Sequence, residues 1–142
     1  MTMIDQKERD ECLRLLRESG CSCVVSNGKS RWIGWERGVK DLMCLLKTGS
    51  RQMQGSFVAD KVVGKAAASL MILGGIAELH AGVLSLPAWW LLQQHRIPCK
   101  AGILVPHIVN RAGNAWCPLE ERCFFAESPE VCLQRIESFL SI

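Results

Sequence analysis

Two groups of residues in this sequence have side chains that could do chemistry. The first group is Asp60, Lys61 and Lys65, which lie in the otherwise apolar stretch "FVADKVVGKAAASLMILGG" at residues 57–75. The second centres on Cys117, in the polar stretch "NRAGNAWCPLEER" at residues 110–122. A pair of lysine ammonium groups can hold an anion, and a cysteine thiolate is a nucleophile. The sequence therefore offers an anion site, a reactive thiol, or both.

The lysine stretch has the pattern of a buried helix. Apolar residues fill positions 62–73 almost all round, so we expect a central helix from about residue 60 to residue 73, closed by Gly74 and Gly75. Asp60 would then be its N-cap, and both lysines would lie where the helix dipole disfavours cations. Two interpretations stay open at this point. The lysines either reach out into solvent, or join the free helix N–H groups in binding an anion.

The cysteine stretch has the pattern of a helix start. Pro118 suits the first helical position, and Glu120 follows Cys117 by three residues, as in a capping box. A thiol at a helix N-terminus has its thiolate form favoured, and Arg111 would strengthen that effect. Asn110 belongs to the same polar loop. The alternative is that Cys117 is simply a small apolar residue of the core.

The bulk composition restricts the classes of protein that need to be considered. The chain has 142 residues, which we interpret as one domain spanning 1–142, and 49% hydrophobic with 22% charged residues are globular values. A net charge of +3 without a dense basic stripe gives no strong nucleic-acid signal. No apolar run reaches the ~18 residues of a membrane span, and "MTMIDQKERDEC" lacks the apolar run of a signal peptide. We therefore expect a cytoplasmic protein without a membrane partner.

The cysteines are expected to be thiols, not disulfides or metal ligands. A cytoplasmic chain keeps its cysteines reduced, and none of the eight occurs in a C-x-x-C pair. We therefore predict no metal and no other cofactor.

The elements that must position these residues follow an α/β order. We predict a three-layer α/β/α domain around a mixed sheet of about five strands, with the two later strands parallel. A site would then form at the carboxyl ends of the parallel strands. Trp32, Trp35, Trp89 and Trp90 are expected to pack in the core and between layers. The expected elements are a helix at 10–20, a hairpin at 21–36, a helix at 38–49, a loop at 50–56, the lysine helix, strands at 76–85 and 97–105, and helices at 88–96, 117–123 and 128–140.

At these residues the chain resembles a known group. The segments "SFVADKVVGKAAASLMILGGI", "VLSLPA" and "VPHIVNRAGNAWCPLEE" are similar to a small prokaryotic family of unknown function, grouped by fold with the cytidine deaminases. The combination of D-K-x-x-G-K with N-R-x-G-x-x-x-C-P-x-E carries the resemblance. It implies a cytidine deaminase-like fold.

The resemblance also implies that the zinc site of that fold is missing. Zinc deaminases carry H-x-E and P-C-x-x-C motifs at the starts of two helices. Here Ala59, Asp60 and Lys61 stand at the first place, and Ala88 and Leu91 occupy the cysteine positions at the second. Without zinc there is no metal-activated water. We therefore do not expect hydrolytic deamination by the family's usual route.

Two functions of different classes remain open. The first is a metal-independent enzyme, with Cys117 as nucleophile and Lys65 and Asp60 as its catalytic partners. The second is a binding module for a small anionic molecule such as a nucleotide, without any reaction. In both cases we assign ligand binding to four residues: Lys61, Asn110, Arg111 and Glu120. A purely structural subunit is a third reading, and the chain could form a homo-oligomer.

Overall fold

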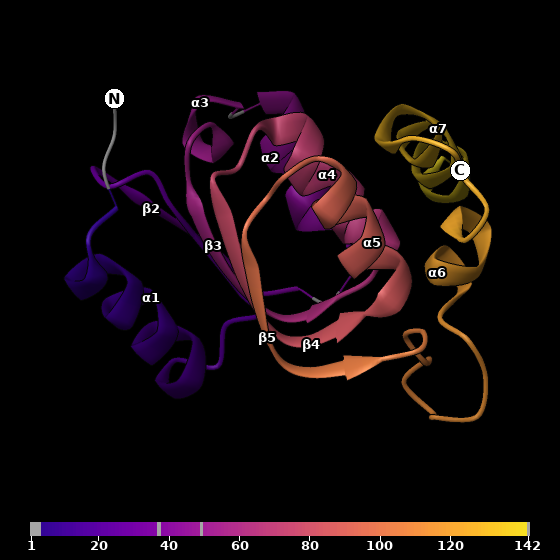
Figure 1. The fold of residues 1–142 in the computed structure, drawn as a ribbon, viewed down its shortest axis with the longest axis horizontal. Helices are drawn as coiled ribbons and strands as arrows, with labels where there is room; N and C mark the ends of the chain where they lie inside the picture. Colours follow the sequence, from indigo (N-terminus) through magenta and orange to yellow (C-terminus); the bar gives the residue numbers. More distant parts are fainter. Residues whose placement is uncertain (1–3, 37, 49, 142) are drawn as a thin grey trace.

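A mixed five-stranded sheet forms the centre of the molecule (Figure 1). The computed structural model describes residues 4–36, 38–48 and 50–141. In the strand order β2-β1-β3-β4-β5, β1 runs antiparallel to both β2 and β3, whereas β3, β4 and β5 are parallel. The strands are β1 Cys23–Ser26, β2 Arg31–Gly34, β3 Phe57–Val63, β4 Glu78–Ser85 and β5 Cys99–Val105. The predicted antiparallel hairpin and the two predicted parallel strands are confirmed.

Helices cover both faces of the sheet, which gives the expected α/β/α layering. Helix α1 (Gln6–Glu18) packs on one face, and α2 (Lys40–Thr48), α4 (Lys65–Gly74) and α5 (Leu86–Gln94) pack on the other (Figure 1). The short α3 (Ser50–Met53) occupies part of the segment for which we predicted a loop. Helix α6 (Pro118–Cys123) and α7 (Pro129–Leu140) follow β5, and α7 packs against α4.

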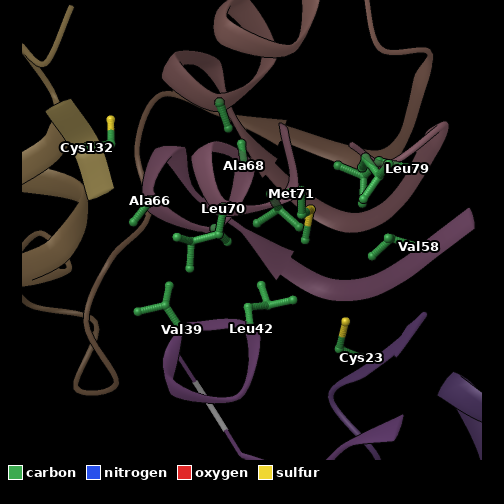
Figure 2. Packing of buried hydrophobic residues seen from close by; sticks show 14 of the residues in the cluster. Cys23, Val39, Leu42, Val58, Ala66, Ala68, Leu70, Met71, Leu79 and Cys132 are labelled. Atoms are coloured by element: carbon green, nitrogen blue, oxygen red, sulfur yellow. The ribbon is translucent and has the colours of Figure 1, made fainter. Parts of the chain in front are cut away.

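The main core lies between the sheet and the layer of α2 and α4. Figure 2 shows Leu70 and Met71 of α4 above Leu42 of α2, with the sheet residues Val58 and Leu79 on the side of Met71. All five side chains are almost completely buried. Helix α4 is apolar nearly all round because it contacts the sheet, α2, α5 and α7. Its burial explains why that part of the sequence reads so clearly as a central helix.

The predicted start of this central helix is wrong. Residues 57–63 form strand β3, and α4 begins only at Lys65, after Gly64 as its N-cap. Asp60 therefore does not cap a helix, and Lys61 lies on a strand instead of in a helical turn. The physical reason is composition: Phe57, Val58, Val62 and Val63 are residues that favour a pleated strand. The C-terminal end is as predicted, because Gly75 adopts the left-handed conformation that ends α4.

The parallel strands share an irregular row near their carboxyl ends. Lys61, Gly82 and Gly102 fall in one row of the sheet, between the paired rows on either side. A Cβ atom on Gly82 would lie 2.7 Å from the carbonyl oxygen of Lys61, and one on Gly102 would lie 2.8 Å from that of Gly82. Only glycine fits at positions 82 and 102. In β3, both Lys61 and Val62 are exposed before Val63 is buried again.

Across the described ranges, no helix has the length and apolar character needed to cross a bilayer.

Candidate functional site

A cavity of about 620 Å³ opens beyond the carboxyl end of β3. Its walls come from the start of β1, the end of β2, the start of α2, the loop after β5 and the start of α6. All but one of the residues that we predicted to form a site line this cavity. They are Asp60, Lys61, Asn110, Arg111, Cys117 and Glu120. The exception is Lys65.

Asp60 is a nearly buried carboxyl group on the cavity wall. It lies opposite Cys23 in the β1–β3 pair and is only 8% exposed. The backbone N–H of Val62 donates a long hydrogen bond of 3.3 Å to its Oδ1. Burial raises the pKa of Asp60 to about 7, against the opposing effects of hydrogen bonds from Val62, Cys23 and Lys61. Burial, together with the charge of Asp60, also holds the pKa of the Cys23 thiol well above its usual value.

The two lysines have different surroundings. Lys61 is exposed on β3 and lines the cavity. Lys65 is 8% exposed, and its ammonium donates hydrogen bonds of 2.9 Å to the carbonyl oxygen of Phe124 and 2.7 Å to that of Ala126. These carbonyls belong to the end of α6 and the turn after it, so Lys65 ties α4 to the α6–α7 connection. The prediction that Lys65 shares a site with Cys117 is therefore not met by this geometry.

Glu120 performs the capping that we had assigned to Asp60. Its Oε1 accepts a hydrogen bond of 2.8 Å from the backbone N–H of Lys65, and its Oε2 accepts one of 2.9 Å from that of Ile108. The carboxylate thus occupies the N-terminus of α4, where an anion is favoured. Glu120 is 1% exposed, and a Cβ on Gly64 would lie only 3.1 Å from its Oε1. The predicted capping box with Cys117 is wrong, because the N–H of Cys117 donates to the carbonyl of Ile108 instead.

Cys117 stands at the cap position of α6 without capping it through its side chain. The thiol is half-buried and belongs to the cavity lining, so it is not a core cysteine. Lys65 does not line this cavity, and its ammonium is hydrogen-bonded to the carbonyl oxygens of Phe124 and Ala126 instead. The loop before Cys117 is braced by Asn110, whose side chain exchanges hydrogen bonds with Asn114, and Arg111 is exposed at the cavity edge.

Sequence reasoning missed an aromatic wall of the cavity. Trp32 and Trp35 both line it, and Trp35 is 60% exposed, which corrects our expectation that it packs in the core. Asp41, in the first turn of α2, accepts hydrogen bonds of 3.1 Å and 3.2 Å from the backbone N–H groups of Trp35 and Glu36. Asp41 therefore fixes the chain that presents Trp35. Its signal in the sequence was an acidic residue in the first turn of a predicted helix.

The positions that would carry the zinc motifs of a deaminase hold no cluster of metal-binding side chains within the described residues. Ala88 and Leu91 are buried apolar residues of α5, and Asp60 and Lys61 do not open a helix. Within the part of the chain that the structure describes, no three His, Cys, Asp or Glu side chains are grouped so that they could hold a metal ion.

Comparison with known proteins adds a family and a fold. A family model described as a domain of unknown function (DUF1893) matches residues 11–140. A crystal structure of a DUF1893 family protein (TM1506) from Thermotoga maritima is similar to this chain with a TM-score of 0.89 and 25% sequence identity. The match covers 97% of this chain and 93% of that one. No curated protein matches significantly.

Proposed function

The chain belongs to the DUF1893 family, and from the geometry of its cleft we propose that it binds a small polar molecule beside Asp60. The observation that carries this proposal is a carboxyl group that is nine-tenths buried and yet lines an open cavity. Because the pKa of Asp60 lies near neutrality, the group can offer a donor or an acceptor to a ligand. A ligand N–H or O–H group would add a partner to this carboxyl, whose hydrogen bond from Val62 is long at 3.3 Å.

The other walls indicate what kind of molecule would fit. Trp35 offers an exposed aromatic face, on which a planar ring could stack. Lys61 and Arg111 are exposed cations on the same lining, and neither forms an ion pair within the described residues. A molecule with a planar polar ring and an anionic group would use all three features. A nucleotide, or another small anion of similar build, meets that description.

An enzyme acting through Cys117 is the second candidate. One observation favours it: a half-buried thiol and a carboxyl group with a pKa of about 7 line the same cavity. Such a carboxyl could take a proton from a thiol or a ligand at neutral pH. The binding proposal ranks first because Lys65, which we expected to assist the thiol, does not line this cavity.

We also propose that the fold is related to that of the cytidine deaminases. The parallel strands β3, β4 and β5, with α4 and α5 between them in sequence, agree with the arrangement that the resemblance implies. The cavity would then correspond to a deaminase pocket without zinc ligands.

Calorimetric titration of the purified chain tests the binding proposal. The probes are a nucleobase, its nucleoside, the nucleoside monophosphate and inorganic phosphate. We expect the monophosphate to bind tightest, and Asp60→Asn and Arg111→Ala each to weaken it by roughly tenfold, the usual effect of losing a hydrogen bond to a charged group. Lys29→Ala, at the far turn of the hairpin, is the matched control. Equal affinities in all variants, or no heat with any probe, would refute the proposed ligand class.

Alkylation separates the two candidates. An enzyme of the proposed kind needs a reactive thiolate, so iodoacetamide should modify Cys117 faster than the exposed Cys44 at pH 7. If Cys117 reacts no faster than Cys44, only the binding proposal survives.

A further inference from the structure

A second cavity, of about 610 Å³, lies where the Lys65 side chain ends. It is lined by parts of α4 and α5, by Pro106 after β5, and by the connection between α6 and α7. It shares no lining residue with the Asp60 cleft. Nothing in the proposed function uses this cavity.

The ammonium of Lys65 lies in the wall of this second cavity. Lys65, Phe124 and Ala126 all line it, and these are the residue that donates and the two residues that accept its hydrogen bonds. An ammonium group has three N–H donors, and the two carbonyls engage two of them. The third donor has no acceptor among the described residues. No carboxylate of the described residues lies within ion-pair distance of Lys65.

The rest of the lining is mostly apolar. Leu86, Pro87, Leu91 and Pro106 line the cavity, and Trp90 presents an aromatic side chain that is 61% exposed. We had expected Trp90 to pack inside the protein, and its exposure is a second correction. A mostly apolar cavity of this size with one fixed polar group is the usual form of a small-molecule site.

Two further polar residues limit the choice of ligand. Gln94 of α5 adds an amide that can donate or accept. Glu127, exposed at the rim, adds a negative charge that opposes multiply charged anions. A buried cation beside apolar walls, with a carboxylate at the rim, therefore favours a ligand with a single negative charge and an apolar body.

We propose that this second cavity binds a small organic carboxylate, whose oxygens accept the third N–H of Lys65 and whose apolar or aromatic body packs against Trp90. The site differs in chemistry from the Asp60 cleft, where recognition rests on a carboxyl group and exposed cations. Its failure or success is therefore independent of the proposed function.

The test uses the unmodified protein and a matched pair of probes. 3-Phenylpropanoate and its neutral amide have the same shape but differ in charge. Binding is followed by nuclear magnetic resonance through the indole N–H of Trp90 and the backbone amides near Gln94. We expect the carboxylate to cause saturable shifts there, and the amide to bind roughly tenfold more weakly, because it lacks the charge-assisted hydrogen bond.

Two tryptophan variants test whether the probe binds in the second cavity or in the Asp60 cleft. Trp90→Ala should abolish the shifts near Gln94, while Trp35→Ala, a matched control that removes an equally exposed tryptophan from the other cleft, should leave them unchanged. Both positions are on the surface, so both variants should fold. The proposal is overturned if carboxylate and amide bind equally, if the shifts appear at Trp35, or if neither probe binds at up to about 10 mM, an affinity below that of most specific sites.

A second pair of probes, which are peptides, tests whether the carboxylate belongs to a small molecule or to a protein C-terminus. A tetrapeptide that ends in phenylalanine with a free carboxylate is compared with its amidated form. Binding of the free peptide tighter than 3-phenylpropanoate would replace the small-molecule proposal with a site for a protein C-terminus. Weaker binding of the free peptide than of 3-phenylpropanoate supports the small-molecule proposal.

Discussion

The backbone N–H of Lys65 donates a hydrogen bond of 2.8 Å to Oε1 of Glu120, which lies 55 residues later in the chain. Through this bond the loop and helix after β5 close over the start of α4. The same carboxylate also accepts from Ile108 at 2.9 Å, and thereby holds the loop that carries Asn110 and Arg111. One buried side chain thus shapes both the helix start and one wall of the Asp60 cleft.

Replacing Glu120 with alanine should destabilise the fold strongly. The variant leaves the buried N–H of Lys65 without an acceptor, at a cost of about 1–3 kcal/mol, and also the partly buried N–H of Ile108, at a smaller cost. We expect Glu120→Ala to lower the free energy of unfolding, measured with urea. Glu120→Gln should lower it less, because an amide oxygen can still accept one hydrogen bond. Glu121→Ala, exposed on the same helical turn, is the control. A Glu120→Ala variant as stable as this control would show that the carboxylate does not hold the loop.

Lys65 and Lys61 should respond very differently to the same substitution. Lys65→Met removes two hydrogen bonds to carbonyl oxygens in a buried setting, each worth about 1.5–3 kcal/mol when the donor is charged. Lys61→Met changes an exposed residue and should alter unfolding by no more than about 0.5 kcal/mol. Guanidinium unfolding of both variants checks this. Similar midpoints for the two would mean that Lys65 does not tie α4 to the α6–α7 turn.

Asp60 should make the protein less stable as pH rises from about 4 to about 7. Its pKa in the folded state is raised to about 7, from an ordinary value of 3.8. In this window the folded chain holds a proton that the unfolded chain has released, so stability falls with a slope approaching about 1.4 kcal/mol per pH unit. Asp60→Asn should remove that slope. The difference between the two stability curves between pH 4 and pH 8 gives the measurement, and parallel curves would contradict a raised pKa.

Glu8 of α1 should show the opposite pH dependence. It accepts hydrogen bonds of 2.8 Å and 2.7 Å from Arg31 and one of 2.6 Å from Ser26, and the bond to Arg31 is the main reason that its pKa is lowered to about 2. The stability that it contributes is present above pH 4.5 and is lost as pH falls towards 2. Glu8→Gln should therefore destabilise the protein at pH 7 and have little effect near pH 2.

The control for Glu8 lies on the same helix. Glu11 pairs with Arg14 on the exposed surface, where such pairs contribute about 0–1 kcal/mol. In thermal unfolding at pH 7, Glu8→Gln should have a melting temperature well below that of Glu11→Gln. Equal melting temperatures would place the Glu8 contacts among ordinary surface pairs.

Much of the fold was accessible from local patterns, because those elements depend on neighbours in the chain. Asn27-Gly28 marked the hairpin, Gly75 ended α4, and Ser128 caps α7 through a hydrogen bond from the N–H of Val131. The error at residues 57–63 arose where two elements adjoin without a polar loop. Gly64 separates β3 from α4, and a single glycine inside an apolar run can be read as part of a helix.

Most residues of the candidate site could be predicted from the sequence, but their arrangement in space could not. The parallel-strand rule placed Asp60 and Cys117 at one edge of the sheet, and both do line one cavity. The fate of Lys65 could not be predicted, because the carbonyls that bind it are 59 and 61 residues away and carry no side-chain signal. Trp35 was missed for a related reason. Its exposure depends on how Asp41 holds the chain, and hydrophobicity alone favoured burial.

The Glu120 carboxylate at the start of α4 behaves as a tethered ligand. A tether supplies an effective concentration that is at least about millimolar for a short flexible link, and here the group is held in place by folding itself. A free phosphate or carboxylate would have to compete against an anion that never diffuses away. The backbone N–H of Lys65 is therefore already occupied when a molecule enters the neighbouring cleft.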